Sequence, residues 1–390
     1  MGEESVSLYI HIPFCRAKCA YCSFNSYQGL EHLKAPYVQA LVREIEGYFQ
    51  PDKLKAITMY FGGGTPSLLS LEQLAELLAA SSRAFRIEEG SEITLEANPG
   101  TIDLLYLKGL RKLGVNRLSL GVQSLDDRTL CILGRIHSAR EALEAYGMAR
   151  QAGFSNINLD LIYSLPTQTL VQWEDTLRRA ILLEPDHLSL YPLTLEEDTP
   201  LAQRVARGEL PFPDEDLAAD MYLLAEEMLD AAGYEHYEIS NWARMLPGCS
   251  CGELGYLASR HNLTYWRNEP YLGFGAGAHS YFGAQRYYNA LSPAEYIVRL
   301  ESGRSPQVGV EEIGEALEMA ETMIMGLRLL EGIDKGIFQR RFGQDLMKTY
   351  GEEIEELIEL GLIEMEGERM KLTPRGRLLG NEVFQRFLPS

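Results

Sequence analysis

The sequence predicts an α/β protein: a full or partial (β/α) barrel followed by a small winged-helix-like domain. Short apolar runs with β propensity alternate with amphipathic helical runs through most of the 390 residues. This alternation is typical of parallel strands that are buried on both faces. After about Arg304, helical periodicity dominates, apart from one hairpin pattern. The length alone fits two or three domains.

The predicted barrel elements follow one another without a repeat or a low-complexity tract. Between the strands lie helical runs, of which the first two are residues 36–49 and 70–85. The predicted strands, in chain order, are residues 7–12, 56–61, 92–97, 117–123, 156–163 and 187–193. In a barrel built from such units, the chemistry is expected at the carboxyl ends of the strands.

The domain boundaries follow from the change in periodicity. We expect residues 1–301 to form the barrel domain with a C-terminal extension, residues 302–310 to be a linker, and residues 311–390 to form the winged-helix-like domain. In the last domain, two short helices flank a Gly-Ile-Asp turn, and a helix, a hairpin over residues 366–368 and another helix follow.

Charge excludes one common role of winged-helix domains. The net charge is -20, and residues 351–368 contain eight Glu and no Lys or Arg. A surface of this sign opposes binding to the phosphate backbone, so we expect no nucleic-acid partner.

The N-terminal segment predicts a cytoplasmic protein. Residues 1–7 are acidic and polar, which does not fit a signal peptide, and no apolar run approaches the roughly 20 residues that span a bilayer. Cysteines in the cytoplasm stay reduced, so a cluster of them indicates metal binding or catalysis.

Three cysteines near the N-terminus, Cys15, Cys19 and Cys22, are spaced C-x3-C-x2-C. Structural zinc usually requires four ligands in paired spacing, and only one C-x2-C pair is present. An iron–sulfur cluster with an incomplete protein shell fits better, because thiolates are its usual ligands. Three cysteines would hold three irons of a four-iron cluster and leave the fourth open to a substrate.

Later motifs place polar groups near strand ends. The sequence FGGGTPS (residues 61–67) follows a strand directly; it is either a tight turn or a place where backbone amides approach a ligand. Each polar residue near the other strand ends is by itself an ordinary loop residue, but together they favour a shared pocket. These residues are Glu96, Gln123, Arg135 and Asp160.

The C-x3-C-x2-C motif is the hallmark of the radical S-adenosylmethionine (SAM) enzymes, which this sequence resembles. With the later motifs, it resembles the branch that contains oxygen-independent coproporphyrinogen III oxidase and related heme chaperones. The resemblance extends from Tyr9 to the C-terminal domain and implies a partial barrel of the radical SAM type. It also implies a 4Fe-4S cluster whose open iron takes the amine and carboxylate of SAM. An external donor would supply the electron that cleaves SAM to a 5′-deoxyadenosyl radical.

The resemblance implies roles for residues within the matching motifs. The residue matching Tyr9 lies near the SAM methionine in that family, and those matching Gly63, Gly64 and Thr65 contact its amino group. Other matching residues contact the SAM carboxylate and ribose or line the pocket; they are Glu96, Gln123, Arg135 and Asp160.

Two departures separate this sequence from the oxidase. The oxidase pattern has a fourth cysteine two residues after the third, where this chain has Phe24. The oxidase also has a sizeable extension before its cluster, whereas fourteen residues precede Cys15 here. The segment CSFNSY instead resembles that of the chaperones, with Ser23 in place of their usual Asp.

A second block, HNLTYW, matches the H-N-x-x-Y-W motif that is associated with heme binding in the chaperone branch. His261 would be an iron ligand, and Tyr265 and Trp266 would offer aromatic surface to the macrocycle. Arg260 and Arg267 would pair with the heme propionates. The alternative is a packed loop at the barrel end with a hydrogen-bonded histidine.

The resemblance therefore implies a heme chaperone that delivers heme to heme-requiring apoproteins such as respiratory enzymes, and it allows a homodimer. The rival function is anaerobic oxidation of coproporphyrinogen in porphyrin biosynthesis. Three further cysteines remain. We expect Cys249 and Cys251 to lie in a variable loop, with extra thiolate ligation as the alternative, and Cys131 to lie in the core.

Overall fold

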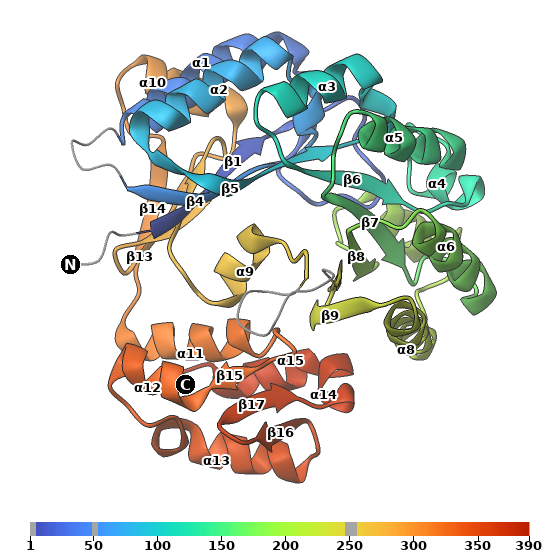
Figure 1. Ribbon diagram of the computed structural model, residues 1–390, viewed down its shortest axis with the longest axis vertical. Coiled ribbons are helices and arrows are strands. Elements are labelled where there is room, and N and C mark those ends of the chain that lie inside the picture. The colour runs from blue at the N-terminus through green and yellow to red at the C-terminus, as the bar shows by residue number, and fades with distance from the viewer. Residues whose placement is uncertain (1–4, 49–53, 246–255, 390) are drawn as a thin grey trace.

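A computed structural model describes residues 5–48, 54–245 and 256–389. It consists of an arched, mostly parallel sheet with helices on its convex side, and a smaller C-terminal module below the arch (Figure 1). No helix in the described ranges is both long and apolar enough to cross a membrane.

Seven parallel strands form the middle of the sheet. Their burial is nearly continuous, as expected for strands covered on both faces. In spatial order they are β11 (Tyr271–Phe274), β1 (Ser5–Ile12), β4 (Lys55–Gly63), β5 (Arg86–Ala97), β6 (Arg117–Gln123), β7 (Ile157–Tyr163) and β8 (His187–Pro192).

Antiparallel strands continue the sheet on both sides, and its two outermost strands do not pair, so the sheet does not close into a barrel. Beyond β8 lie β10 (Asn241–Arg244) and β9 (Tyr234–Glu238). Beyond β11 lie β12 (His279–Phe282), β13 (Gln285–Asn289) and β14 (Gln307–Glu312). The predicted partial barrel is thus confirmed.

The helices of the arch bury one apolar face against the sheet. Several begin with a reciprocal capping box, for example Ser70 with Gln73 at α2. These helices are α1 (Lys34–Glu46), α2 (Leu71–Ala84), α3 (Leu104–Lys112), α4 (Asp127–Ile132), α5 (Ala139–Gln151), α6 (Leu170–Leu182), α7 (Pro200–Ala206), α8 (Glu215–Ala231) and α10 (Pro293–Glu301). Short 3-10 turns are η1 (Glu31–Leu33), η2 (Pro66–Leu68), η3 (Pro99–Thr101) and η4 (Gln385–Phe387).

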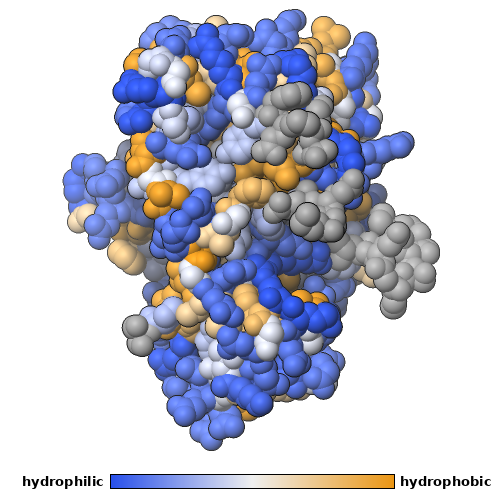
Figure 2. Space-filling model, turned by 90° about the vertical axis from the view of Figure 1, so that its left-hand side faces the viewer, coloured by the Kyte–Doolittle hydropathy of each residue, from blue (hydrophilic) through white to orange (hydrophobic). Residues whose placement is uncertain are grey.

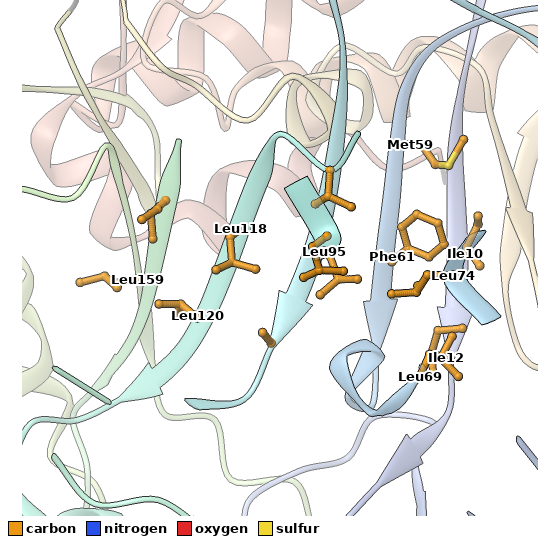
Figure 3. Packing of buried hydrophobic residues seen from close by; sticks show 14 of the residues in the cluster. Ile10, Ile12, Met59, Phe61, Leu69, Leu74, Leu95, Leu118, Leu120 and Leu159 are labelled. Carbon is orange, nitrogen blue, oxygen red and sulfur yellow. The ribbon is translucent and has the colours of Figure 1, made fainter. Parts of the chain in front are cut away.

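The main core lies between these helices and the sheet. Figure 3 shows part of it, where leucines and isoleucines of adjacent strands pack side by side with Phe61 and with Leu74 of α2. Burial of this continuous apolar layer holds the strand ends of the arch in a fixed position.

The C-terminal module has a core of its own, around Met323, Phe338 and Ile354. Its helices and the hairpin at residues 366–368 follow the predicted order. A short third strand, which the sequence did not predict, forms at the expected Gly-Ile-Asp turn and pairs with the hairpin. The elements are α11 (Glu315–Gly326), β15 (Ile333–Asp334), α12 (Lys335–Phe342), α13 (Leu346–Glu359), β16 (Ile363–Glu366), β17 (Arg369–Leu372), α14 (Pro374–Leu378) and α15 (Gly380–Phe384).

Two local expectations are wrong. The segment 302–310 is not only a linker, because β14 begins within it at Gln307 and pairs with β13 at the edge of the large sheet. Cys131 is not a core residue: it lies on α4 and is exposed. Cys249 and Cys251 lie outside the described residues.

Candidate iron–sulfur and cofactor site

The cysteine loop is closed by two very short parallel strands, β2 (Phe14–Cys15) and β3 (Tyr27–Gln28). Inside the loop, Lys18 Nζ donates hydrogen bonds to the carbonyl oxygens of Phe24 (3.3 Å) and Ser26 (3.1 Å). His11 Nε2 donates to the carbonyl oxygen of Asn25 at 2.8 Å. The loop is therefore held in shape by its own polar contacts.

Each cysteine sulfur has a polar neighbour. Thr65 Oγ1 donates to Cys15 Sγ at 3.6 Å, and Arg135 Nη1 donates to Cys19 Sγ at 3.3 Å. Burial raises the pKa of the Cys15 thiol, and the hydrogen bond from Thr65 opposes that shift. Donors directed at sulfur stabilise thiolates, the form that binds iron.

The three thiols fit a cluster with an open position. All three line one large pocket, and every described cysteine is free of disulfides. In the described ranges, no group of three or more His, Cys, Asp or Glu side chains is arranged to hold a single metal ion. The thiols instead face an open space from a loop that carries hydrogen-bond donors, which suits a group larger than one ion.

The Gly-rich turn after β4 packs tightly against β1 and β2. Gly63 has a φ of 113°, and a Cβ there would lie 2.5 Å from the His11 ring. A Cβ on Gly64 would lie 2.7 Å from the carbonyl oxygen of Phe14. These glycines are required by the turn itself. Their amides are also occupied: Gly64 N–H donates to the Ile12 carbonyl at 2.8 Å.

Glu96, at the end of β5, accepts a hydrogen bond from the Gly63 amide of this turn. Its carboxylate accepts hydrogen bonds from Gly63 N–H at 3.1 Å and from the Tyr60 hydroxyl at 2.8 Å. Burial, with the nearby Asp160 carboxylate, raises the pKa of Glu96 to about 7. The residue joins β4 to β5 and adds a carboxyl group to the pocket wall.

Gln123 and Arg135 come from the next part of the arch. Gln123 ends β6 with a φ of 67°, which is uncommon for a residue with a side chain and is often found at functional sites. Arg135 Nη2 donates to the carbonyl oxygen of Gly121 at 2.5 Å while Nη1 reaches Cys19. Arg135 thus connects the cysteine loop to the end of β6.

Asp160 on β7 accepts hydrogen bonds from Ser119 Oγ at 3.0 Å and from Asn158 Nδ2 at 2.7 Å. Burial raises its pKa. The same Asn158 contacts His187 Nδ1 through its carbonyl oxygen at 2.7 Å. A buried polar network therefore fixes this part of the pocket floor.

The structure brings most of the predicted site residues together around one pocket of about 1140 Å³. Its lining includes the three cysteines and seven of the residues expected to bind SAM: Gly63, Gly64, Thr65, Glu96, Gln123, Arg135 and Asp160. Most come from the carboxyl ends of adjacent strands and the turns that follow, as the sequence predicted, whereas Asp160 lies in the middle of β7 and Arg135 follows α4.

Four predicted residues do not line this pocket: Tyr9, His261, Tyr265 and Trp266. Tyr9 lies on β1, where its hydroxyl is 3.0 Å from His11 Nδ1 and its ring stacks 6.2 Å from that of Tyr60. Tyr9 therefore packs behind Tyr60, whose hydroxyl binds Glu96 in the pocket wall.

The HNLTYW segment forms a helix, α9 (Arg260–Trp266), inside the arch between the sheet and the C-terminal module (Figure 1). His261 is 1% exposed, with Nδ1 2.7 Å from Thr58 Oγ1 and Nε2 3.0 Å from the Tyr265 hydroxyl. Burial and the nearby Arg117 cation lower its pKa to about 3. Both ring nitrogens are thus engaged, as in the hydrogen-bonded alternative that the sequence left open, although the segment is a helix and not a loop.

The far end of α9 supports the C-terminal module. The guanidinium of Arg328 lies over the Trp266 ring, 4.5 Å from its centroid. Arg341 donates to the carbonyl oxygens of Arg267 (3.1 Å) and Asn268 (2.8 Å). One face of the partly buried Trp266 ring is therefore covered by Arg328.

Comparisons with known proteins agree with this geometry. The model of the radical SAM superfamily matches residues 9–180, and that of the HemN C-terminal domain matches residues 317–379. The heme chaperone HemW of Bacillus subtilis is 38% identical over 98% of this chain and 99% of its own length. The chain belongs to the HemW family of radical SAM proteins.

Other relatives extend the comparison. The heme chaperone HemW of Mycobacterium tuberculosis is 36% identical over 100% of this chain and 96% of its own. The bovine mitochondrial radical S-adenosyl methionine domain-containing protein 1 is 38% identical over 93% of this chain and 82% of its own. The solved structure of Escherichia coli coproporphyrinogen III oxidase (HemN) superposes with a TM-score of 0.85 at 25% identity, over 99% of this chain and 90% of that one.

In this radical SAM protein, sequence reasoning missed the pocket residues that lie far from the cysteines in the chain. Tyr163, Tyr191 and Tyr222 line it from β7, β8 and α8. The C-terminal module contributes Arg328, Arg377, Leu378, Leu379 and Phe384. No motif marks these residues: most sit in ordinary strand or helix patterns, and Arg328 and Leu379 lie in short turns between elements.

Proposed function

We propose that this protein is a heme chaperone that binds a 4Fe-4S cluster, SAM and heme, and delivers heme to heme-requiring apoproteins such as respiratory enzymes. The proposal is supported by full-length similarity to relatives named heme chaperone HemW. The cluster would supply a low-potential electron at its open iron, and a separate electron donor would be a further partner.

The chain's own residues have definite tasks in this proposal. Cys15, Cys19 and Cys22 would ligate the cluster, and Thr65 and Arg135 hydrogen-bond two of these sulfurs. SAM is a cation at its sulfonium and ammonium groups, and the carboxyl groups of Glu96 and Asp160 would attract it. Because the site requires reduced thiols, we place the protein in the cytoplasm.

Phe24 is the observation that favours a chaperone over an oxidase. It stands where the oxidase pattern has its fourth cysteine, and its side chain is 66% exposed beside the pocket. No thiol is available at that position to take part in a reaction. The similarity in fold to coproporphyrinogen III oxidase keeps that oxidation as the second candidate function.

The test uses the full chain with its cluster reconstituted without oxygen. With reductant, SAM and coproporphyrinogen we expect no protoporphyrinogen, and with heme we expect one equivalent bound per chain, followed by absorbance. Phe24→Cys and Phe24→Ala form a matched pair that separates a restored thiol from a lost ring. Sustained turnover of coproporphyrinogen by the unmodified protein, without specific heme binding, would replace the chaperone by the oxidase. Light scattering would show whether the protein is a homodimer.

A further inference from the structure

The pocket beside the cysteines is larger than one small ligand needs. Its volume is about 1140 Å³, whereas single-ligand pockets usually measure about 300–1,000 Å³. One end holds the cysteines and the expected SAM residues. Tyr191, Tyr222 and the C-terminal module line the rest of the pocket, which we call its second end, and nothing described so far uses these residues. The second end adjoins the expected SAM residues, because Tyr191 lies near Asp160.

This second end gathers hydrophobic side chains that are exposed in the structure. Tyr191 is 41% exposed, and Leu378 and Leu379 are each 40% exposed, yet all three line the same pocket. Elsewhere hydrophobic residues are interspersed with hydrophilic ones, as on the face in Figure 2. Exposed apolar groups that converge on a pocket indicate a site for an apolar body.

Two cations of the C-terminal module, Arg328 and Arg377, line the same end. The Nε atoms of both are buried and have no hydrogen-bond partner within the described residues. Arg328 is held by the rings of Trp266 and Phe384, at 4.5 and 5.8 Å, and Arg377 Nη2 contacts Glu226 at 2.8 Å. The buried Nε atoms do not face the pocket, but both residues line it, and guanidinium groups are suited to carboxylates, which they can bind in a two-point fork.

The other charges of this end do not replace the arginines. Glu196, Glu215 and Glu382 also line the pocket, but all three are exposed, so water and salt screen them. No histidine appears among the described residues that line it. A flat ligand here would be held by apolar packing against its ring and by hydrogen bonds to its carboxylates, and not by a bond between an imidazole and a metal ion.

We propose that this end is the heme seat: the macrocycle lies against Tyr191, Leu378 and Leu379, and its propionates bind Arg328 and Arg377. The inference rests on the proposed function and specifies its cargo site. It moves the expected heme contact from α9 to the C-terminal module. The recognised chemistry, an apolar macrocycle with two carboxylates, is shared by heme and metal-free protoporphyrin.

The test compares heme with heme dimethyl ester, whose propionates are blocked. We expect the reconstituted protein to bind heme about ten-fold or more tightly than the ester, because charge-assisted hydrogen bonds form only with free carboxylates. The double variant Arg328→Gln/Arg377→Gln should lose this preference and bind both ligands with similar affinity. Arg386→Gln is the matched control, since Arg386 pairs with Glu356 inside the same module and does not line the pocket.

Arg328→Lys guards against misfolding of the double variant, because it keeps the charge and should retain part of the preference. Equal preference for heme over the ester in the wild type and the double variant would overturn the seat while leaving the chaperone proposal intact. If the double variant bound heme and the ester more weakly by the same factor, that result would also overturn the seat and leave the chaperone proposal intact. If the unmodified protein binds no heme, the proposed function fails, and the seat fails with it. Tighter binding of tetracarboxylate coproporphyrin than of heme would overturn heme as the occupant.

Discussion

Cys15, Cys19 and Cys22, the proposed ligands of the cluster, lie very close together in the sequence. They lie within one short loop, which β2 and β3 close and Lys18 braces from inside. The hydrogen bonds from Thr65 and Arg135 to two of the sulfurs come from elsewhere in the chain. The loop is also tied to distant segments, since Ala20 N–H donates to the Leu133 carbonyl at 2.9 Å and Asn25 Nδ2 donates to the Ala276 carbonyl at 2.9 Å.

Replacing any one of these three cysteines by Ala should therefore abolish the cluster, which holds about four irons in the proposed type. Iron analysis and visible absorbance after anaerobic reconstitution measure this. Cys131→Ala is the matched control, because Cys131 is exposed on α4 and lies outside the pocket lining. Full iron content in Cys19→Ala would show that the ligand assignment is wrong.

Glu44 is a buried carboxyl group whose protonation we expect to govern stability. Its carboxylate accepts hydrogen bonds from Gly275 N–H at 2.9 Å, Asn289 Nδ2 at 2.6 Å and the Tyr296 hydroxyl at 2.5 Å. Burial nevertheless raises its pKa from 4.5 to about 7. The folded protein thus binds this proton more tightly than the unfolded chain does.

The free energy of unfolding should consequently fall as pH rises from about 4.5 to 7, and this contribution should be constant above that range. The expected size is on the order of 3 kcal/mol for a shift of this magnitude. Urea unfolding of wild type and Glu44→Gln at several pH values measures it. The stability advantage of the wild type should shrink toward neutral pH, and an advantage that does not change with pH would contradict the assignment.

At the scale of single elements, α9 has a supporting role that its motif does not reveal. Its first turn is held by Glu92, whose carboxylate accepts from the backbone N–H groups of Arg260 (3.0 Å) and His261 (3.2 Å). Its last residue lies under Arg328 of the C-terminal module. The helix therefore connects the sheet that carries the cofactor site with the module that covers it.

We expect His261→Ala to destabilise the protein by about 1–3 kcal/mol, because it leaves the hydroxyls of Thr58 and Tyr265 buried without their partner. The heme absorbance spectrum should stay unchanged. Denaturant unfolding and a heme titration of the same sample separate the two effects. Normal stability with an altered heme spectrum would instead identify His261 as an iron ligand.

At the scale of the whole molecule, the pocket exists because the C-terminal module docks on the arch. The docking surface combines polar and apolar contacts. Arg286 pairs with Glu321 at 2.8 Å, and Asn268 Nδ2 donates to Thr322 Oγ1 at 3.1 Å. Leu329 of the module also packs in an apolar cluster with Tyr237 and Leu263 of the arch. Several independent contacts therefore hold the module over the pocket.

Arg341→Ala should loosen this docking, since it removes hydrogen bonds to two backbone carbonyls after α9. We expect amide hydrogen exchange in α11 and α12 to become several-fold faster, while exchange in the strands of the arch is unchanged. Arg386→Ala is the control, because Arg386 pairs with Glu356 inside the module. Unchanged exchange in α11 and α12 would show that other contacts carry the docking.

The sequence by itself determined the alternation of strands and helices, the close spacing of the three cysteines, and the pocket residues at strand ends such as Glu96 and Gln123. These features depend on local spacing and on the rule that parallel strands end at one edge. Only the tertiary structure decided that His261 is buried, that residues 307–312 form an edge strand, and that Arg328 and Arg377 face the pocket of Cys15. Such placements follow from packing and pairing between separate segments, such as Thr58 with His261 or β13 with β14, and no local pattern encodes them.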